Sequence, residues 1–165
     1  MSRSLKEFLA ENAARLQVEK QKSVVRRDEW TEAVDNLRNE VKNWLHESDP
    51  DGLFSVEETP VTIVEEGIGN YEVKGLTMTL GPRVIHLTPI SRAVVDPWSD
   101  SAPRVFVGVR GRIDLTNGLK TYSLYRFQPD KNYPIYQWFI YDQDTYTNAF
   151  FDKDKFESVM QSLLE

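Results

Sequence analysis

The fold is decided by the stretch "RIDLTNGLKTYSLY" at residues 112–125. Two runs in which apolar and polar residues alternate flank Asn117 and Gly118. Asn-Gly is the strongest short signal for a two-residue hairpin, because both centres of a type I′ turn need a positive φ. A turn of this kind fixes the register of its two strands by counting outward from it. The stretch therefore predicts a pair of antiparallel strands.

The register predicted by this turn, with Thr116 opposite Leu119, also predicts two faces. The buried face should hold Val105, Val107, Val109, Ile113, Leu115, Tyr122 and Leu124. The polar face should hold Arg104, Arg110, Arg112 and Asp114, with Thr121, Ser123 and Tyr125 opposite the last three. On it we expect a cation–π pair between Arg110 and Tyr125 and an ion pair between Arg112 and Asp114. A solvated outer face and a binding surface are both open interpretations.

The β-rich pattern begins after Pro50 and continues through short segments separated by turn residues. Strands are expected at 60–66, 71–80, 83–89, 104–116, 119–127 and 135–142. They predict a six-stranded antiparallel meander over residues 59–144, curved where Gly108 and Gly111 interrupt a strand. The last strand carries aromatic residues on both faces, so both of its faces should be covered.

Helices are expected at both ends of the chain. Residues 1–48 contain no Gly or Pro, and Ser4 with Glu7 forms a capping box. Two apolar stripes recur at helical spacing: Leu5, Phe8, Leu9, Ala13 and Leu16, and then Trp30, Ala33, Val34, Leu37, Val41, Trp44 and Leu45. We favour two packed helices, because the segment between these stripes is polar and only weakly periodic; one continuous helix is the alternative. Trp30 and Trp44 are expected in the core. A C-terminal helix at 151–165, capped by Asp152, completes a single α+β domain over residues 1–165.

Composition excludes several classes of function. The chain has 165 residues, a formal net charge of -6 and no cysteine, so disulfides, thiolate metal sites and a cysteine nucleophile are excluded. The acidic balance argues against nucleic acid as a partner, because such binding depends on neutralising phosphates. No apolar run long enough to span a membrane and no signal-peptide core is present, so we expect a cytoplasmic protein with no membrane association.

Two fragments resemble the PD-(D/E)xK nuclease signature: Pro50-Asp51, and Glu72 followed two residues later by Lys74. The resemblance implies that Asp51 and Glu72 hold a magnesium ion while Lys74 steadies charge on the phosphate. A magnesium-dependent nuclease is therefore one alternative function. A small-ligand carrier, with an aromatic-lined cavity behind Tyr122, Trp138 and Ile140, is a second.

The function we favour from the sequence is a non-catalytic domain that binds a protein partner, as an accessory, chaperone-like or immunity-type protein. No cofactor or metal is expected. The contact residues should be of two groups, since Trp, Tyr and Arg are enriched among interface anchors. They are Arg92, Asp96 and Trp98 in the long loop at 88–103, and Arg110, Arg112 and Tyr125 on the polar sheet face.

Overall fold

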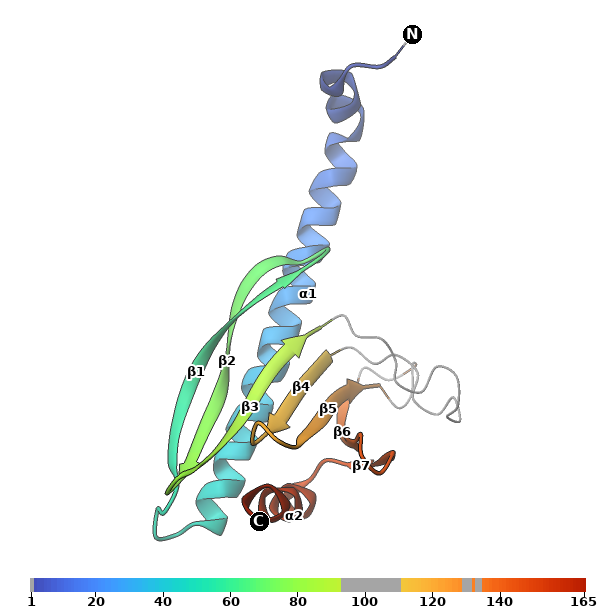
Figure 1. Cartoon of the computed structure of the whole chain (residues 1–165). Coiled ribbons are helices and arrows are strands. Elements are labelled where there is room, and N and C mark those ends of the chain that lie inside the picture. Colours follow the sequence, from blue (N-terminus) through green and yellow to red (C-terminus); the bar gives the residue numbers. More distant parts are fainter. Residues whose placement is uncertain (1, 93–110, 129–131, 133–134) are drawn as a thin grey trace.

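The computed structural model describes residues 2–92, 111–128, 132 and 135–165. Its elements, in chain order, are α1 (Leu5–Ser48), β1 (Ser55–Glu65), β2 (Gly69–Leu80), β3 (Arg83–Ser91), β4 (Gly111–Thr116), β5 (Thr121–Phe127), β6 (Gln137–Asp142), β7 (Thr147–Phe150) and α2 (Lys153–Leu164). The strands form one open sheet in which each pairs antiparallel with its neighbour along the chain (Figure 1). The α+β class and the meander are confirmed.

The predicted strand count of six is wrong, because the described residues contain a seventh strand, β7. It pairs with β6 after a tight turn in which Asp142 Oδ1 accepts a hydrogen bond of 2.9 Å from Asp144 N. Tyr146 takes a positive φ of 56° in this turn. A tyrosine at such a position gives no turn signal in the sequence, since glycine or asparagine normally occupies it. The sheet also begins earlier than expected, at Ser55.

The preference for two N-terminal helices is wrong as well, and the alternative of one helix is confirmed. α1 is continuous over 44 residues, which corresponds to about 66 Å at the usual rise per residue. The capping box is present, with Ser4 and Glu7 bonded reciprocally. The polar middle segment needs no break, because it lies on an exposed part of the helix. Every buried residue of α1 lies between Trp30 and Leu45.

The turn at Asn117 spans four residues, not two. Thr116 pairs with Thr121, and the Asn117 side-chain oxygen accepts hydrogen bonds from Leu119 N and Lys120 N, at 2.9 and 2.8 Å. The predicted register is therefore wrong by two residues. A shift of two keeps each side chain on its predicted face.

The main core lies between α1, α2 and one face of the sheet. The described residues of the predicted buried face (Ile113, Leu115, Tyr122 and Leu124) are all at most 7% exposed. Trp30 is fully buried, and Trp44 packs edge-on against Phe151 with 5.5 Å between ring centroids. α2 begins after Asp152, which accepts a hydrogen bond of 2.8 Å from Lys155 N, as predicted. It contributes Phe156, Val159, Met160 and Leu163.

A second, smaller apolar cluster lies on the opposite face of β5 and β6. It contains Tyr125, Phe127 and Phe139, which are 5%, 1% and 1% exposed. Ile140, which faces the main core, is 2% exposed, so the prediction that both faces of this strand are covered is confirmed. Tyr125 was placed on the predicted polar face, so the interpretation of that face as solvated is wrong at this residue.

The hairpin of β1 and β2 leaves the sheet halfway along its length and follows α1. β2 pairs with β3 only from Leu76 to Leu80, and the rest of the hairpin extends beside the helix (Figure 1). Gly75 stands at the divergence, where a Cβ would come within 2.2 Å of Leu87 O. At the tip, Ser23 Oγ of α1 donates a hydrogen bond of 2.6 Å to Gly67 O. This contact marks the last point at which the sheet supports the helix.

Candidate protein-binding site

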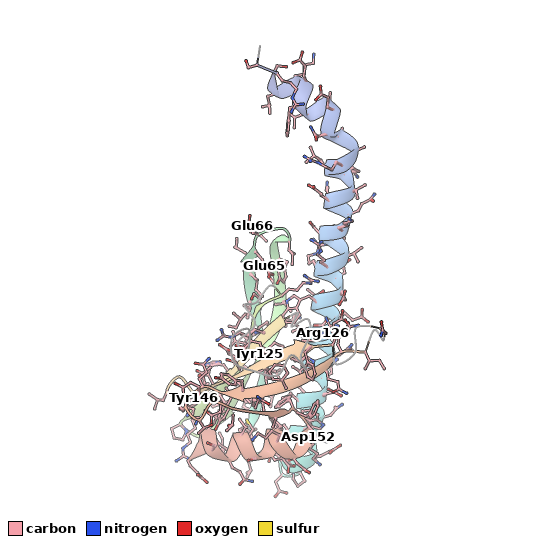
Figure 2. All side chains as sticks on the ribbon, turned by 90° about the vertical axis from the view of Figure 1, so that its right-hand side faces the viewer. Glu65, Glu66, Tyr125, Arg126, Tyr146 and Asp152 are labelled. Atoms are coloured by element: carbon pink, nitrogen blue, oxygen red, sulfur yellow. The ribbon has the colours of Figure 1, made fainter. Side chains whose placement is uncertain are left out.

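The N-terminal part of α1 projects beyond the sheet, and we call residues 5–22 the arm (Figures 1 and 2). It is about 27 Å long at the usual helical rise. Every hydrogen bond and ion pair that the side chains of the arm make within the described residues stays within residues 3–22. These are Ser4 with Glu7, Arg3 with Glu11, Asn12 with Phe8 O and Arg15 with Glu19. The arm therefore has no tertiary support from the described part of its own chain.

One side of the arm carries a line of side chains spaced three or four residues apart, and we call it the arm stripe. It consists of Leu5, Phe8, Leu9, Asn12, Ala13 and Leu16. Leu5, Leu9 and Leu16 are 72%, 47% and 38% exposed. Amphipathic helices of soluble proteins normally bury such a stripe. The arm stripe is thus an apolar surface that the described residues of the same chain leave uncovered.

The arm stripe continues the core-facing side of α1. Leu9, Leu16, Ser23, Trp30 and Leu37 follow one another at intervals of seven residues, so they lie close to one line along the helix. Trp30 and Leu37 are buried against the sheet, and Ser23 meets the hairpin tip. Beyond Ser23 the same side of the helix is exposed. A molecule that covered the arm stripe would therefore lie directly above the hairpin tip.

The helical form of the arm is set by the rest of α1. An isolated helix of this length is marginally stable in water, because forming its first turn loses more conformational entropy for each hydrogen bond than extending it does. Here the part of α1 from Trp30 onward is fixed by the core, and the arm extends an existing helix. The capping box at Ser4 and Glu7 closes its free end. The arm is therefore helical because it extends a helix that the core holds in place.

A polar groove of about 550 Å³ lies at the base of the arm, between α1 and β2, and is lined by Arg27, Thr31, Asp35, Arg38, Asn70, Tyr71, Glu72, Val73 and Lys74. Arg38 is 7% exposed and donates to Asp35 Oδ1 at 2.7 Å and to Lys74 O at 3.1 Å. Its Nε lies 3.3 Å from Glu58 Oε1. A hydrogen bond from Lys42 and the charge of Arg38 lower the pKa of Glu58. Because these charges satisfy one another, the groove is best described as a joint between helix and hairpin.

The contact residues predicted from the sequence fall in three situations. Asp96, Trp98 and Arg110 lie outside the described residues. Arg112 is half-buried and donates two hydrogen bonds to Asp114, at 2.9 and 3.0 Å, which confirms the predicted ion pair. Tyr125, opposite Arg112 in the sheet, is buried and stacks on Phe139 with 5.5 Å between ring centroids.

Arg92, the remaining predicted contact residue, follows β3 and is half-buried. Its backbone N–H donates a hydrogen bond of 3.3 Å to Glu65 Oε2. Arg112 pairs with Tyr125 in the sheet, so the structure brings these two predicted residues together. Arg92 instead contacts Glu65 at the end of the hairpin. Arg92 and Arg112 are half-buried and Tyr125 is buried, so none of the three is an exposed anchor.

The residues of the nuclease resemblance are not brought together. Asp51 lies in the turn after α1, where β1 begins opposite Thr79. Glu72 is seven positions from Thr79 along β2, which corresponds to about 23 Å in a strand. Lys74 lies on the hairpin beside Glu58, 3.8 Å away. Within the described residues, no group of three or more His, Asp or Glu side chains could hold a metal ion.

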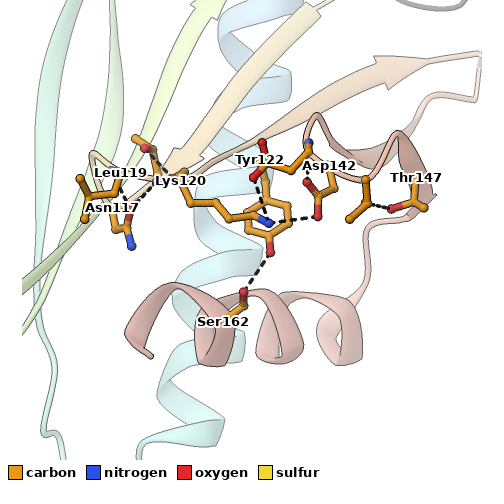
Figure 3. Close-up of polar contacts among 10 residues, drawn as sticks. Asn117, Leu119, Lys120, Tyr122, Asp142, Thr147 and Ser162 are labelled. Atoms are coloured by element: carbon orange, nitrogen blue, oxygen red, sulfur yellow. Dashed lines mark hydrogen bonds and ion pairs between the residues drawn. The ribbon is translucent and has the colours of Figure 1, made fainter.

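A second polar cluster joins the end of the sheet to α2 (Figure 3). Lys120 Nζ lies 3.2 Å from Asp142 Oδ2 and 3.4 Å from Asp144 Oδ2. Tyr122 Oη and Ser162 Oγ are 3.0 Å apart. Burial tends to raise the pKa of Asp142, but hydrogen bonds from Asp144 N and Lys120 outweigh it and lower that pKa. The cluster is a salt-bridged link between elements.

A hollow of about 220 Å³ adjoins this cluster and is lined by Tyr122, Ile140, Asp142, Thr147, Asn148, Lys155, Ser158, Val159 and Ser162. The carrier interpretation expects an apolar cavity behind Tyr122, Trp138 and Ile140. The hollow touches two of these residues, yet most of its lining side chains are polar. It is also smaller than the pockets that hold most organic ligands.

Sequence reasoning identified the periodicity of the arm but not its exposure. The apolar spacing of Leu5, Leu9 and Leu16 predicted a helix, and the two-helix interpretation expected that helix to pack against the next one. The signal in the sequence that could have revealed the exposure is a mismatch in length: one continuous helix is much longer than the strands that follow it.

None of the described helices is both long and apolar enough to cross a membrane. Comparisons with protein-family models, curated proteins and solved structures give no match.

Proposed function

We propose that this chain is a non-catalytic, cytoplasmic protein-binding domain of the accessory, chaperone-like or immunity type, and that the arm is its binding element. The observation that carries the proposal is the exposed arm stripe on an ordered helix that the described residues leave unsupported. Exposed contiguous apolar surface on a soluble domain is typical of interaction sites. A helix that lays an apolar line of residues along a partner is a common mode of protein recognition.

The sheet and α2 then serve as the platform that holds the arm. They bury the second half of α1 and fix the position of the helix through the joint at Arg38 and the contact of Ser23 with Gly67. Because the arm is already helical, binding of a partner costs little conformational entropy in the arm. This division of labour explains why a small domain carries a helix much longer than its own core requires.

Paired variants on opposite sides of the arm test the proposal. Leu9→Glu places a charge on the arm stripe, whereas Val18→Glu places the same charge on the far side, where Val18 is 48% exposed and Leu9 47%. Tagged wild-type protein and Val18→Glu should retain the same binding partners during affinity capture from the native host, and Leu9→Glu should lose them. Circular dichroism should show folded protein in all three cases. Equal retention by both variants would contradict the proposal.

At the sites predicted for them, the two alternative functions gain no support from the described residues. A nuclease needs Asp51 and Glu72 within reach of one metal ion, and the strand register separates them. A carrier needs an apolar cavity, and the hollow beside Tyr122 is polar and small. The protein-binding function is therefore the one that the geometry favours.

A further inference from the structure

We propose that the occupant of the arm stripe is a second copy of this chain, whose own arm lies antiparallel against it. The inference rests on the proposed function and names the partner for the same surface. Two arms related by a two-fold axis would each cover the arm stripe of the other. The sheets of the two chains would then lie at opposite ends of the paired arms.

The spacing of the arm stripe is symmetric, which is the requirement for an isologous contact. Its six members are arranged about a point midway between residues 10 and 11. In an antiparallel pair centred there, Leu5 lies opposite Leu16 of the partner copy, Phe8 opposite Ala13 and Leu9 opposite Asn12. Both ends of the contact are then closed by a leucine pair. Large and small side chains alternate in between, as they do in interdigitated helix contacts.

The hairpin tip excludes the parallel arrangement. Ser23 lies on the line of Leu9 and Leu16, and Gly67 of the hairpin occupies the space beside it. In a parallel pair the partner's helix would continue past this level and would collide with the hairpin. It would also place Glu19 against Glu19 of the other copy. In the antiparallel pair the partner's helix begins beside Leu16, so it stops short of the hairpin tip.

Charge permits the pairing. Residues 5–22 contain four basic and three acidic side chains, so two arms approach each other with little net repulsion although the whole chain has a net charge of -6. Asn12 is the polar member of the arm stripe, and its amide already donates a hydrogen bond of 2.7 Å to Phe8 O. That donor therefore stays satisfied when a partner covers it. A single asparagine inside an apolar helix contact fixes register at some cost in affinity.

Sedimentation over a range of protein concentrations tests the pairing. The contact is short, so we expect a dissociation constant in the micromolar range. Wild-type protein should approach twice the chain mass of 19.2 kDa as concentration rises. Leu9→Glu should stay monomeric, and Val18→Glu should behave as wild type. Asn12→Leu should tighten the dimer at least about tenfold, because it completes the apolar contact.

Crosslinking tests the orientation, since the chain has no cysteine of its own. A mixture of the Leu5→Cys and Leu16→Cys variants should form a mixed disulfide on oxidation. Each variant alone should form little. Efficient crosslinking of each variant with itself and none in the mixture would mean parallel arms, and would overturn the proposal.

The outcomes separate this inference from the proposed function. If wild type and Asn12→Leu both remain monomeric, the second copy is wrong as the occupant. Arm-dependent capture of a different protein would then leave the proposed function standing. If Leu9→Glu changes neither the mass nor the captured partners, both proposals fail.

Discussion

Gly111 of β4 lies directly against the indole of Trp30 in α1. A methyl group at Gly111 would come within 2.0 Å of Trp30 Cζ3 and 2.6 Å of Cη2. Trp30 is fully buried and packs against Trp138 with 6.1 Å between ring centroids. The absence of a side chain on β4 at this point is what allows the indole of Trp30 to enter the core.

Gly111→Ala should therefore destabilise the protein by about 2 kcal/mol or more, because overfilling a packed core forces side chains and backbone to shift. Chemical denaturation measures the change in the free energy of unfolding. The variant Trp30→Phe removes ring atoms at the clash, so adding it to Gly111→Ala should cost less than adding it to wild type. Equal costs in the two backgrounds would show that the glycine is not required by the indole.

Arg38→Met should destabilise the protein by about 2 kcal/mol, because the carboxylates of Asp35 and Glu58 and the carbonyl of Lys74 lose a charged donor in a partly buried site. The matched control is Arg26→Met on the same helix, where the side chain is exposed and makes no ion pair among the described residues. Thermal unfolding compares the two. A loss for Arg26→Met as large as for Arg38→Met would assign the effect to helix composition.

Asn117→Asp should separate two roles of one side chain. The carboxylate still accepts from Leu119 N and Lys120 N, but it cannot donate to Leu163 O as Asn117 Nδ2 does at 3.0 Å. The added negative charge near the C-terminus of α2 is also unfavourable. We expect a loss of roughly 1 kcal/mol with the turn retained. Leu119→Thr, at a position that is 98% exposed, should leave the stability unchanged.

Stability should fall in acid. Backbone hydrogen bonds from Phe54 and Leu53 lower the pKa of Asp49, and contacts with Lys42 and Arg38 lower that of Glu58. A folded-state pKa below the unfolded value gives stability that is complete above the unfolded pKa and is lost as pH falls through the folded one.

The melting temperature should therefore be nearly level from pH 7 to about 5 and should decline below about 4.5, near the unfolded carboxyl values of 3.8 and 4.5. Asp49→Asn should make the decline shallower than in wild type. A decline of unchanged steepness in this variant would show that Asp49 is not one of the groups responsible.

Much of the architecture could be predicted from the sequence because local signals act over a few residues. The capping box at Ser4, the cap at Asp152 and the alternation in β4 are of this kind, and each is confirmed. Register and strand count depend on turn geometry instead. The side chain of Asn117 bonds two backbone N–H groups and enlarges its turn, and Tyr146 adopts a conformation that its residue type rarely takes.

The candidate site was harder to predict, because periodicity reports which residues prefer burial and not whether anything covers them. Leu9 and Leu16 are seven residues apart, as are Trp30 and Leu37. Only the length of the sheet decides that the second set is buried and the first is not. Tyr125 is the converse case, since an expected surface residue is buried in the second apolar cluster.

The order of the elements has a consequence for synthesis on the ribosome. α1 is made before the sheet, yet the core cluster that covers it includes Leu124, Ile140 and Phe156, which lie far along the chain. The hydrogen bond from Ser48 Oγ to Glu157 Oε1 joins residues 109 positions apart, so it cannot form until α2 has been made. During translation the core-facing side of α1 therefore stays incompletely covered until α2 is present, although each strand can pair with its immediate neighbour as soon as both have been made.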